Sequence, residues 1–133
     1  MVEGHTVGAI ERGLLVFVGV EKEDTRAQAQ RLLQRILSYR VFADAAGRMN
    51  VSLQENEGGL LLVPQFTLAA DTRKGTRASF TPAADPEHGA DLFEYLLEQA
   101  RKHHGQVESG RFGAYMKVSL TNDGPVTFWL RAN

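Results

Sequence analysis

The chain has 133 residues, of which 43% are hydrophobic, carries a formal net charge of -1 and contains no cysteine. This length and apolar content predict one domain with a single core, and the lack of cysteine excludes disulfides, thiolate metal sites and cysteine nucleophiles. The near-neutral charge excludes nucleic-acid binding through a globally basic surface. The sequence has neither a transmembrane run nor a secretory signal pattern, which favours a cytoplasmic location.

The first third of the chain predicts a hairpin followed by a helix. Residues 7–10 and 14–20 are expected to form strands around a turn at 11–13, because β-branched and large apolar residues flank a turn-forming glycine. Asp24 is expected to cap a helix that begins near Thr25. The apolar positions of this helix recur at helical spacing, at Ala29, Leu32, Leu33, Ile36 and Leu37.

The middle of the chain predicts three further strands. Residues 40–43 and 48–53 are separated by a turn at 44–47. The apolar run at 60–63 is too short for a typical helix and predicts a strand buried on both faces.

The last third predicts a second helix and a closing hairpin. Asp85 and Pro86 are typical of a helix cap and first turn, and the helix is expected to end near Gly105. Its predicted apolar stripe consists of Leu92, Phe93, Leu96, Leu97 and Ala100. Residues 115–120 and 126–131 are strand-like and flank a strong turn signal. The predicted fold class is therefore α+β, a curved mixed sheet or partly closed barrel with two main helices packed on it.

The usual catalytic and metal-binding sets are missing from the sequence. None of the four histidines sits beside a serine in a nucleophile-elbow setting, and no spacing of histidines and carboxylates suggests a metal site. His103 and His104 are interpreted as polar or cationic groups at a helix C-terminus, where the dipole favours positive charge. Neither a metal nor a cofactor is predicted.

The segment Gln65-Phe66-Thr67 is unusual because it interrupts an apolar strand region. Backbone N–H groups turned outward at Phe66 and Thr67 could hold a developing oxyanion. An ordinary strand end, with Thr67 chosen for β propensity and Gln65 for solvent, explains the same residues.

Two loop segments likewise have both a structural and a functional interpretation. At Gly124-Pro125 a hairpin turn suffices, but the glycine also lets the backbone approach a ligand and the proline, if cis, fixes two neighbouring carbonyl groups in one direction. The basic cluster of Arg73, Lys74 and Arg77 fits either a solvated loop or a local contact with RNA.

Taken together, these stretches resemble the D-aminoacyl-tRNA deacylase (D-tyrosyl-tRNA deacylase) family, and the resemblance covers almost the whole chain. The similar segments are residues 7–10, 13–16, 39–44, 47–50, 65–68, 77–80, 110–114 and 122–127.

The resemblance implies hydrolysis of the ester that joins a D-amino acid to the terminal ribose of tRNA, with glycyl-tRNA as a further substrate of the family. It also implies a homodimer in which Gly124-Pro125, with a cis peptide bond, completes the partner's site. Fixed carbonyl groups there would accept the amino group of a D-residue and leave no room for an L side chain.

For the chemical step, the resemblance implies a site at Gln65, Phe66 and Thr67. Backbone N–H groups around Phe66 and Thr67 would stabilise the oxyanion, and water would attack with help from the ribose 2′-hydroxyl. The Thr67 hydroxyl is a candidate nucleophile or orienting group, although no adjacent base is visible to activate it. Arg73, Lys74 and Arg77 are the candidates for tRNA contact.

Two departures from the family pattern affect these expectations. Pro64 stands where the motif usually has serine, and proline removes a backbone donor just before the site. The family also begins with an additional strand, carrying a Gln-Arg-Val-like stretch that supports the Gly-Pro turn, and residues 1–133 are expected to form a single domain that lacks it. The alternatives are a non-catalytic aminoacyl-tRNA binding module and a general carboxylic-ester hydrolase.

Overall fold

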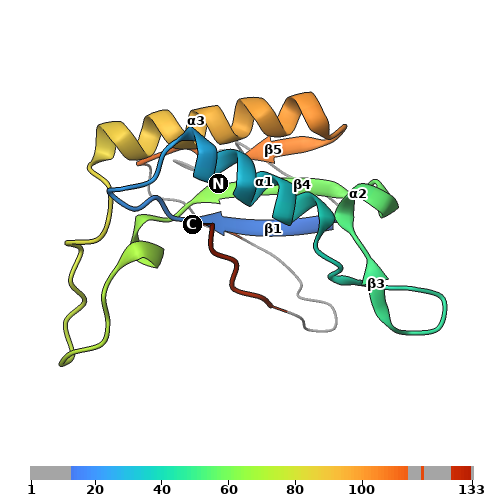
Figure 1. The fold of residues 1–133 in the computed structure, drawn as a ribbon, viewed down its shortest axis with the longest axis horizontal. Helices are drawn as coiled ribbons and strands as arrows, with labels where there is room; N and C mark the ends of the chain where they lie inside the picture. The colour runs from blue at the N-terminus through green and yellow to red at the C-terminus, as the bar shows by residue number, and fades with distance from the viewer. Residues whose placement is uncertain (1–12, 114–117, 119–126, 133) are drawn as a thin grey trace.

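The computed structural model describes residues 13–113, 118 and 127–132 of the chain. Its main sheet has three parallel strands in the order β1, β4, β5 (Figure 1). β1 (Gly13–Val18) pairs with β4 (Gly59–Pro64), and β4 pairs with β5 (Val107–Ser109). The central strand β4 therefore has a neighbour on each side.

Two long helices, α1 (Arg26–Ser38) and α3 (Pro86–His103), pack against each other and cover one face of this sheet (Figure 1). A small antiparallel pair, β2 (Phe42–Ala43) and β3 (Met49–Val51), projects from the far end of α1 and is followed by the short helix α2 (Leu53–Asn56).

The core lies between the sheet and the two long helices. Leu60 and Leu62 of β4 are 0% exposed, and Val63 is 3% exposed, so the strand predicted at 60–63 and its burial are confirmed. The helices contribute their predicted apolar stripes, with Leu33, Ile36, Leu37, Leu92, Phe93, Leu96, Leu97 and Ala100 all buried. Burial of these large side chains supplies the main driving force for folding.

The predicted start of α3 is confirmed, whereas that of α1 needs a correction. The Asp85 carboxylate accepts the His88 N–H at 2.9 Å, with Pro86 as the first helical residue. In α1 the cap is Thr25 and not Asp24, and the Thr25 N–H donates to the side-chain oxygen of Gln28 at 2.8 Å.

Asp24 serves the preceding turn instead, because its carboxylate accepts the Glu21 N–H at 2.8 Å. Both Asp24 and Thr25 are good capping residues, so local preference alone does not choose between them.

The predicted strand, turn and strand after α1 are confirmed, although the strands are shorter than expected. Asp44 organises the turn, since its carboxylate accepts the backbone N–H groups of Ala46 and Arg48, both at 2.9 Å, and the Asn50 amide at 3.0 Å. These donors, first the Arg48 N–H and then the Asn50 side chain, lower the pKa of Asp44. Leu53 does not end the second strand but begins α2.

Other parts of the prediction differ from the structure or lie outside it. β5 and α2 were not predicted, and residues 127–132 carry no strand pairing among the described residues. The α+β class is confirmed, but the described strands form an open sheet and a separate hairpin, so closure into a barrel stays a prediction. The expected strand at 7–10 and most of the closing hairpin lie outside the described residues. None of the described helices is long and apolar enough to cross a membrane.

Candidate functional site

The segment Gln65-Phe66-Thr67 does not continue β4 as a strand but enters a turn of 3-10 helix, η1 (Phe66–Ala69). The Gln65 N–H donates to the carbonyl of Val18 at 2.8 Å, which fastens the start of this turn to the end of β1. Pro64, the residue before Gln65, has no N–H to donate. The Gln65 hydrogen bond nevertheless holds the segment in a fixed position at the end of the sheet.

The close approach of η1 to the end of β1 depends on Gly19. A Cβ at this position would lie 2.9 Å from the Leu68 Cβ and 3.3 Å from the Gln65 carbonyl oxygen. Any larger residue would therefore push η1 away from the sheet.

The backbone N–H groups of Phe66 and Thr67 are not used by the hydrogen-bond pattern of η1. The first donors of that pattern are Leu68, whose N–H reaches the Gln65 carbonyl at 3.2 Å, and the residues after it. The first residues of a helical turn have no intrahelical acceptor. Phe66 is 60% exposed and Thr67 is also exposed, so the turn that carries these two donors lies at the surface.

The Thr67 hydroxyl is held by its neighbour in the motif. The Gln65 side-chain amide donates to Thr67 Oγ1 at 2.7 Å. An amide is not a base at neutral pH, so this contact orients the hydroxyl without activating it as a nucleophile.

The basic cluster lies in the loop that follows η1 and extends away from the sheet (Figure 1). Asp71 and Ser79 close this loop through two backbone hydrogen bonds of 2.7 and 2.8 Å. Beyond the closure, the rings of Phe66 and Phe80 lie 5.2 Å apart, which links the end of the loop to the site.

Within the loop, Arg73 is already paired and the other two cations are exposed. The Arg73 guanidinium donates to both carboxylate oxygens of Asp71, each at 2.9 Å. The side-chain hydrogen bond from Arg73, and then its backbone N–H, lower the pKa of Asp71 from 3.8 to about 2. Lys74 and Arg77 are exposed, and neither forms an ion pair with another described residue.

Gly124 and Pro125 lie outside the described residues. His104 is the C-cap of α3, and its ring nitrogen lies 2.6 Å from the Gly58 carbonyl oxygen, which fits the structural role expected for it.

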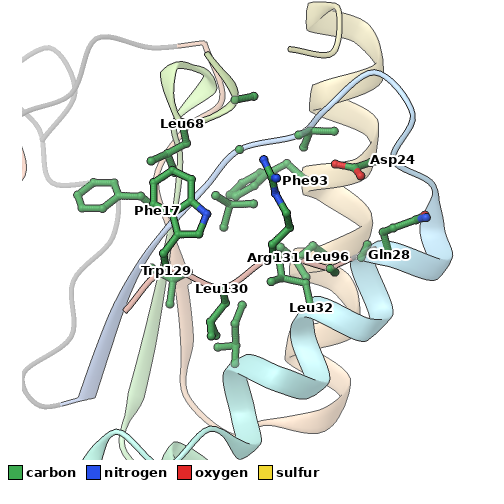
Figure 2. A pocket seen from close by; sticks show the side chains of 18 of the residues that line it. Phe17, Asp24, Gln28, Leu32, Leu68, Phe93, Leu96, Trp129, Leu130 and Arg131 are labelled. Carbon is green, nitrogen blue, oxygen red and sulfur yellow. The ribbon is translucent and has the colours of Figure 1, made fainter. Parts of the chain in front are cut away.

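Sequence reasoning missed a cavity of about 430 Å³ beside β1 (Figure 2). Leu68 and Ala69 of η1 line it, but Gln65, Phe66 and Thr67 do not. The cavity is therefore separate from the exposed donors. It forms between segments far apart in the chain, and no local pattern could have indicated it.

These observations define the general class of protein to which the chain belongs. The chain is an α+β protein with backbone N–H donors and an oriented hydroxyl on an exposed turn at the end of its sheet. Donors arranged in this way can polarise a carbonyl group.

Comparison with known proteins specifies this class. The D-Tyr-tRNA(Tyr) deacylase family matches residues 1–131. A D-aminoacyl-tRNA deacylase of Thioalkalivibrio sulfidiphilus (strain HL-EbGR7) is 65% identical over 129 residues, which are 97% of this chain and 87% of the relative. A D-aminoacyl-tRNA deacylase of Janthinobacterium sp. (strain Marseille) is 61% identical over 98% of this chain and 88% of its own.

Among solved structures, the c-Myc DNA Unwinding Element Binding Protein is similar with a TM-score of 0.94 and 36% identity, over 100% of this chain and 91% of that one. The chain belongs to the D-Tyr-tRNA(Tyr) deacylase family, a family of hydrolases, as the resemblance predicted.

Proposed function

We propose that the chain hydrolyses the ester of D-aminoacyl-tRNA at the turn formed by Gln65, Phe66 and Thr67. The observation that carries this proposal is the pair of backbone N–H groups at Phe66 and Thr67, which have no backbone acceptor among the described residues and lie on a turn tied to the sheet by the Gln65 N–H. Membership of the deacylase family supports the substrate class.

In the proposed reaction, water adds to the ester carbonyl carbon and the carbonyl electron pair moves onto oxygen. The N–H groups of Phe66 and Thr67 stabilise this oxyanion. The electron pair then returns as the bond to the ribose oxygen breaks, and a proton from water ends on that oxygen. The products are the free D-amino acid and tRNA, and the ribose 2′-hydroxyl assists the attacking water.

Replacement of Phe66 tests the oxyanion role with a matched pair of variants. Phe66→Pro removes the N–H, and Gln65 before it is already extended (φ -144°, ψ 92°), as proline requires of its predecessor. Phe66→Ala removes the ring and keeps the N–H. Since one oxyanion donor contributes on the order of 100- to 1000-fold in kcat, Phe66→Pro should be slower than Phe66→Ala by about that factor. Equal rates would remove the Phe66 N–H from the mechanism.

We further propose that chirality is set in a homodimer, with Gly124-Pro125 of one subunit completing the partner's site. Exposed aromatic residues near the proposed site support an interface, because Phe17, Phe66, Phe80 and Trp129 are 44%, 60%, 46% and 68% exposed. Apolar surface of this kind on a single copy is typical of a protein–protein contact.

The proposal extends to the rest of the molecule. The pocket closed by fixed Gly-Pro carbonyl groups would accept glycyl-tRNA, which has no side chain to exclude. Residues 1–133 form one deacylase domain that works in the cytoplasm, and the loop cations contact the tRNA backbone.

The first test is a time course of deacylation with D-tyrosyl-tRNA, L-tyrosyl-tRNA and glycyl-tRNA, beside a spontaneous-hydrolysis control. The proposal expects rapid loss of the D-ester and the glycyl ester only. Loss of the D- and L-esters at similar rates would contradict the chirality filter. Binding of D-tyrosyl-tRNA without turnover would instead establish a non-catalytic binding module.

A further inference from the structure

The exposed charges of α1 and the residues just after it are all positive. These charges, which we call the arginine stripe, are the exposed side chains of Arg26, Arg31, Arg35 and Arg40. Residues 25–43 contain these four arginines and none of the 16 acidic residues of the chain. Helix surfaces that serve solubility alone usually mix both signs, because opposite charges one turn apart stabilise the helix. Since the whole chain has a net charge of -1, the rest of it is negative by formal charge.

The neighbouring helix α3 carries the opposite sign. It lies beside α1 on the same face of the sheet (Figure 1). Its acidic residues recur at helical spacing and are all exposed, at Glu87, Asp91, Glu94 and Glu98. Within the described residues, no ion pair joins the two helices. The helix layer therefore presents a positive and a negative stripe that do not neutralise each other.

The arginine stripe keeps its full charge because its contacts are with neutral groups. The Arg26 guanidinium lies 4.7 Å from the centre of the Tyr95 ring, and the Arg35 guanidinium donates to a backbone carbonyl at 3.0 Å. Arg31 and Arg40 form neither an ion pair nor a side-chain hydrogen bond with another described residue. All four cations are thus available to an anionic partner.

Arginines spaced along one helix suit the phosphates of a nucleic-acid strand. A guanidinium is always charged and can bind phosphate oxygens through two parallel hydrogen bonds. Arg31 and Arg35 are about one helical turn apart, and Arg26 and Arg35 are separated by roughly 14 Å along the axis, at a rise of about 1.5 Å per residue. A chain of repeated negative charges matches this length better than a single small anion does.

The stripe begins at the end of the sheet that holds the proposed site. Thr25, the N-cap of α1, lines the same cavity as Leu68 and Ala69 of η1, so the start of α1 lies close to η1. From there α1 runs toward the opposite end of the sheet (Figure 1). The nucleotides next to the aminoacyl end of a tRNA can therefore reach α1 while the ester lies at η1.

We propose that the arginine stripe binds the phosphate backbone of the acceptor arm of tRNA. This inference rests on the proposed function, which supplies the substrate, and it adds a second contact surface to the loop at 71–79. The acidic residues of α3 repel the same backbone, so the RNA is confined to the α1 side of the helix layer. The stripe contributes to binding of the tRNA body and takes no part in the chemical step at η1.

The test replaces Arg31 and Arg40 with glutamine, which keeps a high helix propensity and removes the charge. Binding of fluorescently labelled tRNA without an amino acid is measured by anisotropy over a series of salt concentrations. In Arg31→Gln/Arg40→Gln, the slope of log K against log salt should fall by about 1.4 to 1.8, twice the value for one phosphate contact. The Kd at physiological salt should rise about tenfold.

Arg101→Gln is the matched control. Arg101 is exposed on α3, about one turn beyond Glu98, so its replacement removes the same charge from the acidic side of the helix layer. The salt slope and the Kd of this variant should equal those of the unchanged protein. A slope that falls no further in the double variant than in Arg101→Gln would overturn the proposal.

Hydrolysis of two esters separates binding of the tRNA body from the chemistry. D-tyrosyl-tRNA carries the backbone that the stripe binds, whereas the D-tyrosyl ester of adenosine has the same ester bond without that backbone. The double variant should raise the KM for D-tyrosyl-tRNA alone. If it slows both esters equally, the arginines act on the site or on the fold, and the proposal is wrong.

Two further outcomes have distinct meanings. If the double variant loses self-association in sedimentation while its tRNA binding is unchanged, the stripe pairs with the acidic residues of α3 in a second copy, and the proposal is wrong. The anisotropy measurement needs no turnover. An unchanged protein that cleaves neither ester, with a salt slope that still falls in the double variant, would therefore contradict the hydrolysis and support the arginine stripe.

Discussion

The Gln65 side chain and the Thr67 hydroxyl form a local pair whose chemistry is limited by the amide. At 2.7 Å the contact fixes the hydroxyl, but an amide does not remove its proton. In the proposed reaction, the backbone N–H groups and the substrate's own 2′-hydroxyl therefore carry the chemical step. A covalent intermediate on Thr67 would need a base that the described residues around it do not supply.

The carboxyl group of Asp71 provides a prediction that needs no substrate. Its pKa is lowered from 3.8 to about 2, first by the side-chain hydrogen bond from Arg73. Because this pKa is depressed, the pairing is fully present above the ordinary value and is lost as the pH falls through about 2.

A carboxyl-carbon NMR titration should place the Asp71 midpoint near 2, and Arg73→Gln should move it up toward 3.8. The pKa of Asp44 is lowered by Arg48 and Asn50 instead, so its midpoint should stay where it is in this variant. An unchanged Asp71 midpoint in Arg73→Gln would mean that the pairing is not maintained in solution.

At the level of elements, η1 is positioned by its contact with the end of β1. Gly19→Ala places a Cβ 2.9 Å from Leu68 Cβ, so η1 should be displaced and kcat should fall about tenfold or more. Gly105→Ala is the matched control, because a Cβ there meets nothing within 4 Å. Chemical denaturation should show a small loss of stability for Gly19→Ala, and full activity in this variant would contradict the positioning argument.

The loop at 71–79 makes a second prediction at this scale. If Lys74 and Arg77 contact phosphates, replacing either with alanine should reduce the slope of log K against log salt for tRNA binding by about 0.7 to 0.9. Arg73→Gln should change the slope less, because Asp71 already takes up the Arg73 charge. Slopes that respond equally at all three positions would argue against this division of roles.

The sequence predicted those elements whose signals are local. The stripe from Leu92 to Ala100 has the periodicity of a buried helix face, and the run at 60–63 is continuously apolar and short, so α3 and β4 were located correctly. β5 has only three residues and is a strand because it pairs with β4, so its local sequence did not predict it.

The candidate site shows the same division between local and long-range signals. The motif Gln65-Phe66-Thr67 was enough to predict the residues of the site. The position of η1 depends on contacts with Val18 and Gly19, which local sequence patterns do not indicate. The cavity also depends on contacts between distant segments. Long-range packing routinely overrides local preference in this way.

For the whole molecule, the proposed shared site predicts complementation between two inactive variants. Phe66→Pro should damage the site in its own subunit, and Pro125→Gly should damage the site of the partner. Random mixing during co-expression gives half heterodimers, each with one intact site, so about a quarter of the original activity should return. Deacylation no faster than in the separate variants would indicate that each subunit forms its site alone.

The parallel arrangement of β1, β4 and β5 also bears on how the chain folds during synthesis. β4 lies between β1 and β5, both of which are far from it in the sequence, and β5 ends at Ser109. Parallel neighbours of this kind pair only after the intervening helices have been made, so few early contacts are local. Most of the polypeptide must therefore leave the ribosome before the sheet is complete, and until then the apolar residues of β1 and β4 are exposed to aggregation.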